Sequence, residues 1–178
     1  WHGNKVQVPS FNIPDHWPLF GALDYGESAP SSFGLYTVDH DDNVYRVTEY
    51  YQGNASASQH AEGITKIIEG CPFTGGRSPQ AIYADPSIFV KRRLTEAMNR
   101  SPADVFGENG LWLTRANNDR INGWRVCNDA LINERFIALR DGTMLYAAQC
   151  LRFQDRPETP KTSTLMPRIM QPMNGVTL

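Results

Sequence analysis

Two aspartates stand where apolar segments of the chain end. Asp24 closes the apolar run at 20–23, and Asp85 closes the apolar run at 81–84. A short apolar run that ends in turn-forming residues is typical of a buried strand, which places each aspartate at a strand end. If these two strands are neighbours, both carboxylates project from one edge of a sheet. Carboxylates that close repel each other unless a cation neutralises them, so the pattern favours a metal site.

Mg²⁺ or Mn²⁺ suits such a pair, because both ions prefer hard oxygen ligands and complete their shells with substrate phosphate. Two such ions about 3.5–4 Å apart promote the in-line phosphodiester hydrolysis of nucleases. The sequence therefore predicts one or two Mg²⁺ or Mn²⁺ ions bound by Asp24 and Asp85. The structural alternative is that each aspartate only forms a turn or caps a helix. Pro86 keeps Asp85 itself out of helical geometry.

The bulk composition is that of one ordinary globular domain. The chain has 178 residues, of which 40% are hydrophobic and 20% charged, with a formal net charge of −2. This charge gives no overall attraction to nucleic acid, so such binding would need a local basic patch. Three widely spaced cysteines fit neither a zinc motif nor a disulfide framework and suggest a reducing compartment. No apolar run approaches the roughly 20 residues of a membrane span.

The hydrophobic pattern predicts an alternation of strands and helices after a polar, proline-rich segment. Residues 1–18 are expected to be a linker, and residues 19–178 the folded domain. Strands are predicted over Leu19–Tyr25, Ser32–Val38, Val44–Tyr51, Ala81–Ala84 and Gly110–Thr114. Helices are predicted over Ser56–Glu69, with Ser56 or Ser58 as N-cap, over Phe89–Met98 and over Ile121–Phe136, with a strand or short helix over Met144–Phe153. Three antiparallel strands followed by alternating elements indicate an α/β fold, a mixed sheet with helices on its faces.

Further charged residues are candidates for the same site. Glu49 lies on a predicted strand, where a one-residue change of register decides whether it faces the metals or the solvent. Lys91, Arg92 and Arg93 follow the Asp85 segment and could contact DNA phosphates, although a run of charge is usually a solvated helix face. Arg115 and Arg120 flank an Asn-Asn-Asp loop that either lines the DNA groove or forms a plain turn.

Other chemically suggestive residues are assigned structural roles. The run His40-Asp41-Asp42 is interpreted as a hairpin turn rather than a metal site. His60 lies on a predicted helix and is expected to be a hydrogen-bonded histidine of the core. Trp112 and Trp124 are expected in the core rather than as platforms for stacked bases.

Seven segments of the chain, in this order, resemble one known family. They are 13–18 (IPDHWP), 21–26 (GALDYG), Pro30, 47–51 (VTEYY), 60–64 (HAEGI), 83–87 (YADPS) and 117–124 (NNDRINGW). Together they resemble the C-terminal nuclease domain of the large terminase subunit of tailed bacteriophages over roughly Ile13 to Leu151. No single segment carries the likeness, and 117–124 is the most specific.

The resemblance implies an RNase H-like fold and a metal-dependent endonuclease that cuts concatemeric double-stranded DNA by two-metal hydrolysis. Asp24 and Asp85 match the family's first two metal-binding acids. The family's third acid lies in an Asp-His-x-x-Asp helix after a segment like Leu165–Met170, and no such motif occurs in the sequence. The third acid is therefore expected beyond Leu178. A domain truncated before that helix would be weakly active or inactive.

The resemblance also implies partners. These are double-stranded DNA, an ATPase domain of the same polypeptide, the portal and the small terminase subunit, in the host cytoplasm at the prohead portal and without a membrane. The chain has no GxxxxGK[ST] motif, so the ATPase motor would precede Trp1. Two alternatives stay open. One is a DNA- or portal-docking module that keeps the fold without turnover, and the other is a different RNase H-like nuclease such as a junction resolvase.

Overall fold

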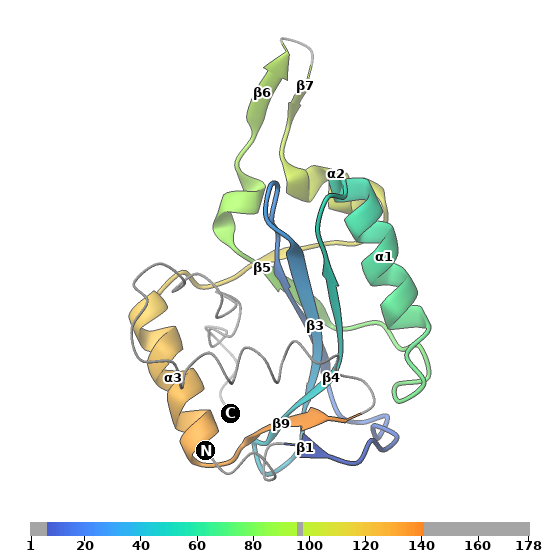
Figure 1. The fold of residues 1–178 in the computed structure, drawn as a ribbon, viewed down its shortest axis with the longest axis vertical. Helices are drawn as coiled ribbons and strands as arrows, with labels where there is room; N and C mark the ends of the chain where they lie inside the picture. The colour runs from blue at the N-terminus through green and yellow to red at the C-terminus, as the bar shows by residue number, and fades with distance from the viewer. Residues whose placement is uncertain (1–6, 96–97, 141–178) are drawn as a thin grey trace.

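The structure is a computed structural model that describes residues 7–95 and 98–140 (Figure 1). Its described strands form a seven-stranded sheet in the order β1-β9-β4-β3-β2-β5-β8 and a separate pair, β6-β7. The strands of the large sheet are β1 (Gln7–Val8), β2 (Leu19–Asp24), β3 (Ser31–Val38), β4 (Val44–Gln52), β5 (Ala81–Ala84), β8 (Thr114–Arg115) and β9 (Phe136–Leu139). The helices are α1 (Ala57–Glu69), the 3-10 helix η1 (Pro86–Phe89), α2 (Pro102–Glu108) and α3 (Arg120–Ile132).

The large sheet is mixed, as the sequence predicts. β2, β3 and β4 pair antiparallel, whereas β5 is parallel to β2 and β8 is parallel to β5. Toward the opposite edge of the sheet, β9 is parallel to β4 and β1 is parallel to β9. β4 and β5 run in the same direction on either side of the β3–β2 pair, so the chain must cross over between them. Helix α1 makes this connection and covers one face of the sheet (Figure 1).

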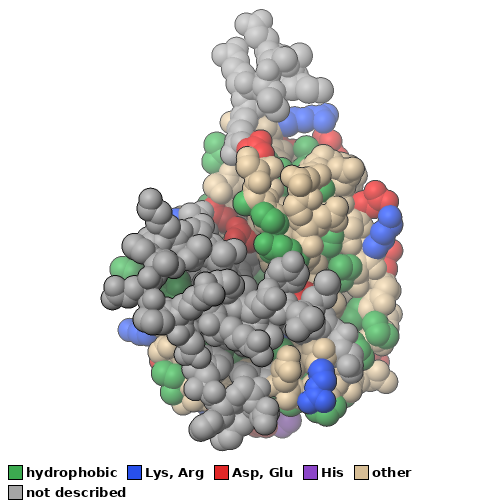
Figure 2. All heavy atoms as spheres, in the orientation of Figure 1, with side chains coloured by type: hydrophobic (Ala, Val, Ile, Leu, Met, Phe, Trp, Pro, Cys, Tyr) green, Lys and Arg blue, Asp and Glu red, His purple; other side chains and the backbone are tan. Residues whose placement is uncertain are grey.

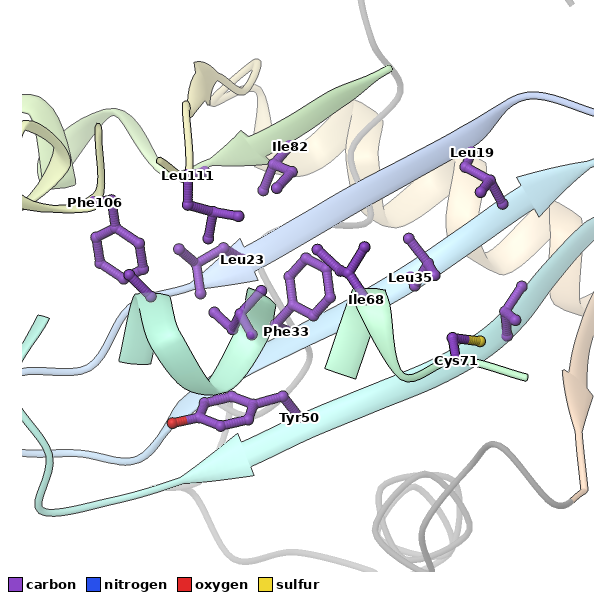
Figure 3. Close-up of a cluster of buried hydrophobic side chains, with 14 of the residues drawn as sticks. Leu19, Leu23, Phe33, Leu35, Tyr50, Ile68, Cys71, Ile82, Phe106 and Leu111 are labelled. Atoms are coloured by element: carbon purple, nitrogen blue, oxygen red, sulfur yellow. The ribbon is translucent and has the colours of Figure 1, made fainter. Parts of the chain in front are cut away.

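The main core lies between the sheet and the helices α1 and α2 (Figure 3). Leu23, Phe33, Leu35, Ile64 and Phe106 are all 0% exposed there. α1 begins where predicted, because the Ser56 side chain accepts a hydrogen bond from the Gln59 backbone and the Gln59 side chain accepts one in return. The burial of these large side chains stabilises the region that carries the β2 and β5 strand ends.

Helix α3 lies on the opposite side of the sheet from α1, which confirms helices on both faces (Figure 1). Among the residues of α3, Gly123 alone is buried. Trp124 is 50% exposed and Trp112 is 78% exposed, so the prediction that both belong to the core is wrong. Trp112 lies against α2, where a Cβ added at Gly107 would be 3.1 Å from the indole ring. The indole therefore covers the surface of α2 instead of entering the core.

The predicted helix over Phe89–Met98 is also wrong. η1 ends at Phe89, and its C-cap, Val90, has an extended backbone (φ −77°, ψ 120°). β6 (Arg92–Thr95) then pairs antiparallel with β7 (Met98–Arg100). This hairpin projects away from the sheet (Figure 1). Helix propensity in so short a segment is weak compared with strand pairing. The chain next enters α2, which the prediction missed although Ser101 and Asp104 form a capping box at its start.

Two further boundaries differ from the prediction. The strand expected over Gly110–Thr114 begins only at Thr114, as β8. The helix expected over Ile121–Phe136 ends at Ile132, because Glu134 takes a left-handed conformation with φ 57°. Phe136 then starts β9, which is a strand rather than the end of a helix. The segment predicted over Met144–Phe153 lies outside the described residues.

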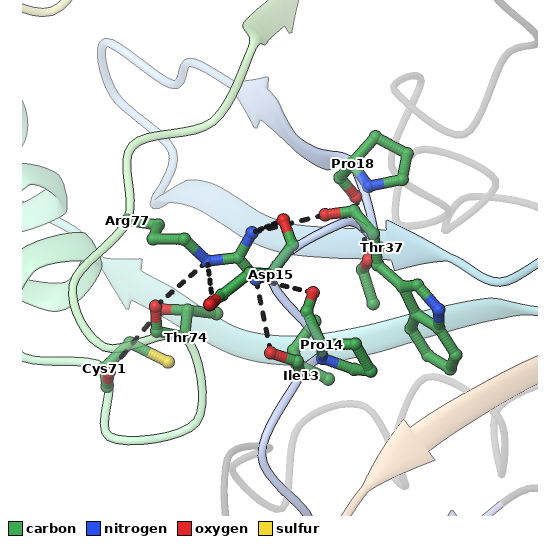
Figure 4. A network of polar contacts seen from close by, with 9 residues as sticks. Ile13, Pro14, Asp15, Pro18, Thr37, Cys71, Thr74 and Arg77 are labelled. Atoms are coloured by element: carbon green, nitrogen blue, oxygen red, sulfur yellow. Dashed lines mark hydrogen bonds and ion pairs between the residues drawn. The ribbon is translucent and has the colours of Figure 1, made fainter.

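The described part of the expected linker packs with the domain. β1 joins the large sheet, and Ile13 is 4% exposed. The guanidinium of Arg77 donates to the carbonyl oxygens of Asp15 at 2.7 Å and of Pro14 at 3.1 Å (Figure 4). It therefore ties this segment to the loop after α1. No helix in the described part of the chain is long and apolar enough to cross a bilayer.

Candidate metal centre

Asp24 and Asp85 stand side by side at the ends of two adjacent parallel strands. The parallel register pairs Leu23 of β2 with Ala84 of β5, and each aspartate is the next residue along the chain. Adjacent strands lie about 4.8 Å apart. Leu23 and Ala84 are both 0% exposed on the α1 side of the sheet. Because side chains alternate along a strand, Asp24, the last residue of β2, faces the side away from α1. Asp85 follows the last residue of β5 with an extended backbone.

The strand ends themselves are rigidly placed. β2 is an interior strand, with β3 on one side and β5 on the other. Gly21 leaves room for core side chains of both neighbouring strands, since a Cβ there would lie 2.8 Å from side-chain atoms of both Ile82 and Phe33. The aspartates at both strand ends are half-buried. A half-buried strand end limits the conformations that a carboxylate can adopt, as a ligand position requires.

Asp85 also caps a helix, which is the structural role that the sequence offered as the alternative to binding a metal. It keeps an extended backbone (φ −54°, ψ 137°) before Pro86, as predicted. One of its carboxylate oxygens accepts a hydrogen bond of 2.8 Å from the backbone N–H of Ser87. Asp85 is therefore the N-cap of η1, and this hydrogen bond orients the carboxylate at the strand end.

Glu49 lies on the same face of the sheet as Asp24 but away from it. It is opposite Gly34 on β3, which in turn is opposite Ala22 on β2. Two strand spacings, or about 10 Å, therefore separate the backbones of Glu49 and β2. The Glu49 carboxylate is 2% exposed and forms an ion pair with Arg46. The structure thus brings Asp24 and Asp85 together without placing Glu49 beside them.

The donor set fits a hard divalent cation with open coordination positions. Within residues 7–95 and 98–140, no three or more His, Cys, Asp or Glu side chains gather as an all-protein metal site would require. Two neighbouring carboxylates are the ligands that Mg²⁺ commonly takes from protein, with water and substrate phosphate filling the remaining positions. They do not match the closed four-ligand cage of a structural zinc ion.

The predicted DNA-binding residues are spread over several elements. Lys91 is exposed in the segment after η1, Arg92 and Arg93 belong to β6 of the hairpin, and Arg120 is the exposed first residue of α3. On the face shown in Figure 2, the Lys and Arg side chains of the described residues are well separated. Arg115, by contrast, lies close to the site, because its guanidinium is 4.7 Å from the centre of the Phe89 ring in η1, the short helix that Asp85 caps.

The remaining candidates have the structural roles predicted for them. Asp39 accepts hydrogen bonds from the backbone N–H groups of Asp41 and Asn43, each at 2.9 Å, which makes this segment a turn. His60 is 1% exposed, and its Nδ1 lies 2.9 Å from the Tyr50 hydroxyl, so it is a hydrogen-bonded core histidine.

The Asn-Asn-Asp loop leads directly into α3. Asp119 is the N-cap, because its carboxylate accepts a hydrogen bond of 3.1 Å from the Asn122 backbone. Asn117 in turn accepts one of 2.9 Å from the Asp119 backbone. These contacts confirm the turn interpretation of the loop and leave its DNA role as a prediction.

Comparison with solved structures relates this fold to phage proteins. The large terminase of a thermophilic bacteriophage, in complex with ATP-gamma-S, superposes with a TM-score of 0.63 and 21% identity, over 84% of this chain and 35% of that one. The nuclease domain of the P22 large terminase gives a TM-score of 0.58 and 16% identity, over 77% of this chain and 69% of that one. The large terminase of bacteriophage HK97 gives 0.52 and 10%, over 77% and 32%.

These likenesses concern the fold. They confirm the predicted RNase H-like architecture and its resemblance to terminase nuclease domains. The chain spans about a third of the thermophilic-phage and HK97 proteins, with 35% and 32% of their lengths covered. No protein-family model matches the sequence, and no curated protein sequence matches it significantly.

Proposed function

We propose that this chain is the metal-dependent DNA endonuclease domain of a viral DNA-packaging motor, and that Asp24 and Asp85 bind its metal. The observation that carries the proposal is the parallel register of β2 and β5, which sets the two aspartates side by side. The same fold occurs in the nuclease domain of the P22 large terminase. Neither a pair of aspartates nor a shared fold would support a nuclease by itself, and both occur together here.

One or two Mg²⁺ or Mn²⁺ ions, when bound, would activate a water molecule and stabilise the charge that develops on a DNA phosphodiester. Asp24 and Asp85 supply the carboxylate oxygens that hold the ions. The hydrogen bond from the Ser87 backbone keeps the Asp85 carboxylate oriented between turnovers. A third carboxylate, proposed beyond Leu178, would complete the ligand set and strengthen binding, because each added carboxylate contributes both charge and a ligand.

DNA would be held mainly through its backbone. Lys91, Arg92, Arg93 and Arg120 are proposed phosphate contacts, which would make binding depend on salt and little on sequence. Following the family resemblance, we also propose an ATPase domain of the same polypeptide, the portal and the small terminase subunit as partners. The place of action would be the host cytoplasm, at the prohead portal.

Cleavage of supercoiled plasmid in Mn²⁺ or Mg²⁺ tests the proposal. The 178-residue chain and a longer chain that continues past Leu178 are compared with their Asp24→Asn and Asp85→Asn variants. We expect cleavage that EDTA abolishes and that either substitution lowers by at least about 100-fold, the scale of losing an electrostatic catalytic group. Cleavage that survives Asp24→Asn would overturn the assignment.

The other outcomes separate the alternatives. If only the longer chain cuts, the third acid lies beyond Leu178. If both chains bind DNA but neither cuts, the domain is a docking module without turnover. If four-way junctions are cut and linear or supercoiled duplex is not, the domain is a junction resolvase.

A further inference from the structure

An aromatic cluster lies directly behind Asp24. The next residue, Tyr25, turns its ring to the α1 side of the sheet, opposite to the Asp24 carboxylate. The Tyr25 ring meets the His60 ring of α1 edge-on, with centroids 6.0 Å apart and planes at 89°. It meets the Phe106 ring of α2 in the same way, at 5.8 Å and 88°. Edge-to-face contacts of this kind fix both the position and the orientation of a ring.

The His60 ring is itself held in place. It is 1% exposed, and its Nδ1 lies 2.9 Å from the hydroxyl of Tyr50 on β4. Helix α1 can approach Tyr50 because residue 63 is glycine, and a Cβ at Gly63 would lie 2.6 Å from the Tyr50 ring. Tyr25 therefore packs against a side chain that is anchored to the sheet rather than against a mobile surface.

The turn that follows Tyr25 is fixed as well. The Gly26 N–H donates to the Ser31 hydroxyl at 3.1 Å, and Ser31 is 0% exposed. A Cβ at Gly26 would lie 2.1 Å from the carbonyl oxygen of Ala29, so only glycine fits. The chain beyond Asp24 is thus held by a ring on one side and by a tight turn on the other.

We propose that Tyr25 is a positioning residue of the metal centre: clamped between His60 and Phe106, it fixes the backbone at Asp24 so that the carboxylate stays beside Asp85. This inference rests on the proposed function of Asp24 as a metal ligand. Tyr25 directly follows Asp24, the last residue of β2, so anchoring the Tyr25 ring restricts the backbone that sets the direction of the Asp24 side chain. Residues that orient a metal ligand typically change metal affinity by about 10- to 100-fold when they are replaced.

Metal binding measures this role without requiring cleavage. The variants are Tyr25→Leu, which removes the ring, and Tyr25→Phe, which keeps it. Ile68→Val, in the same core at the far end of α1, is the control for general destabilisation. Mn²⁺ binding is measured by calorimetry, and the amide signals of residues 24 and 85 are followed by paramagnetic broadening. We expect Tyr25→Leu to raise the Mn²⁺ Kd about tenfold and to weaken the broadening at residue 24. Tyr25→Phe and Ile68→Val should bind Mn²⁺ as the unaltered chain does.

The inference is overturned if Tyr25→Leu binds Mn²⁺ normally, or if Ile68→Val loses as much affinity. Should Tyr25→Leu fail to fold, Phe106→Leu removes the other side of the clamp and must weaken Mn²⁺ binding in the same way. Failure of the proposed function gives a different result, in which Asp24→Asn leaves Mn²⁺ binding unchanged. Absence of Mn²⁺ binding in both the 178-residue chain and the chain that continues past Leu178 would overturn both.

Discussion

Arg46 and Glu49 are three residues apart on β4, and their side chains form an ion pair on the face of the sheet opposite α1. Residues separated by an odd number point to opposite faces of a regular strand. A bulge resolves this conflict, because the register of β4 against β3 shifts between Leu35 and Tyr36 and leaves Val47 as the extra residue. Val47 is 0% exposed in the core on the α1 side. The bulge thus lets Val47 pack in the core on one face while Arg46 and Glu49 pair on the other.

Breaking this ion pair should destabilise the fold. The side chains of Arg46 and Glu49 are 14% and 2% exposed, so Glu49→Gln would leave a largely buried guanidinium without its counter-charge. We expect a loss of about 3 kcal/mol in the free energy of unfolding, measured in urea. The double variant Arg46→Leu/Glu49→Leu removes both charges and should recover most of that loss. Equal stability of the single variant and the unaltered chain would contradict the pair's importance.

Substitutions at Asp85 should separate its two roles. Asparagine caps a helix about as well as aspartate, so Asp85→Asn should leave the free energy of unfolding without metal within about 0.5 kcal/mol. Asp85→Ala also loses the hydrogen bond from Ser87 and should cost about 1 kcal/mol. Both variants should lose the stabilisation that Mn²⁺ gives the unaltered chain in thermal unfolding. Mn²⁺ stabilisation that persists in Asp85→Asn would show that its carboxylate is not a ligand.

Arg77 should stabilise the fold through its hydrogen bonds to backbone carbonyl oxygens rather than through its ion pair with Asp15. Arg77 donates to the carbonyl oxygens of Asp15, Pro14 and Ile13 at 2.7, 3.1 and 3.3 Å, whereas the Asp15 carboxylate is 98% exposed and 3.6 Å away (Figure 4). Arg77→Lys cannot reproduce this fork and should cost about 2 kcal/mol in urea unfolding. Asp15→Ala should change stability by less than about 0.5 kcal/mol. A larger effect of Asp15→Ala would mean that the ion pair dominates.

Elements with strong local signals could be predicted from the sequence. β2, β4 and α1 were predicted to within one residue, because alternation of side chains and the Ser56 capping box are encoded within each segment. The β6–β7 hairpin was missed because its pairing is decided by contacts between strands, and its residues carry ordinary helix propensity. α2 is different, since the capping box at Ser101 that starts it is encoded locally in the sequence.

The proposed metal centre could be predicted only in part. The sequence shows that Asp24 and Asp85 end apolar segments, but their proximity depends on β2 and β5 being neighbours. Which strands are neighbours depends on the topology of the whole sheet, and only the family resemblance implied that these two strands are adjacent. The Tyr25 clamp and the Arg77 contacts could not be predicted, because they join residues that are far apart in the sequence. Every residue has a carbonyl oxygen, so no local sequence pattern marks the ones that Arg77 contacts. Glu49 stayed ambiguous since a bulge changes the facing of a strand by one residue.

His60 should make stability depend on pH in a defined window. Burial lowers the pKa of His60, with a hydrogen bond to the Ala55 backbone opposing the shift. Below about pH 6.5 the unfolded chain therefore takes up a proton at this position that the folded chain does not. The free energy of unfolding should then fall as the pH drops from about 6.5 through the lowered pKa, by at most about 1.4 kcal/mol per pH unit.

The variant His60→Gln keeps a polar group for Tyr50 and has no titrating ring, so its stability should be flatter across that window in thermal or urea unfolding. Asp39 is also a titrating group with a shifted pKa, but it affects stability in a different pH range from His60. Burial opposes ionisation of its carboxyl, but hydrogen bonds from Asn43, Tyr45 and Asp41 prevail and lower its pKa. Stability contributed by Asp39 is present above its ordinary pKa of about 4 and is lost only as the pH falls below that value. Parallel curves for His60→Gln and the unaltered chain between about pH 4.5 and about pH 6.5 would therefore exclude His60 as the source of the dependence.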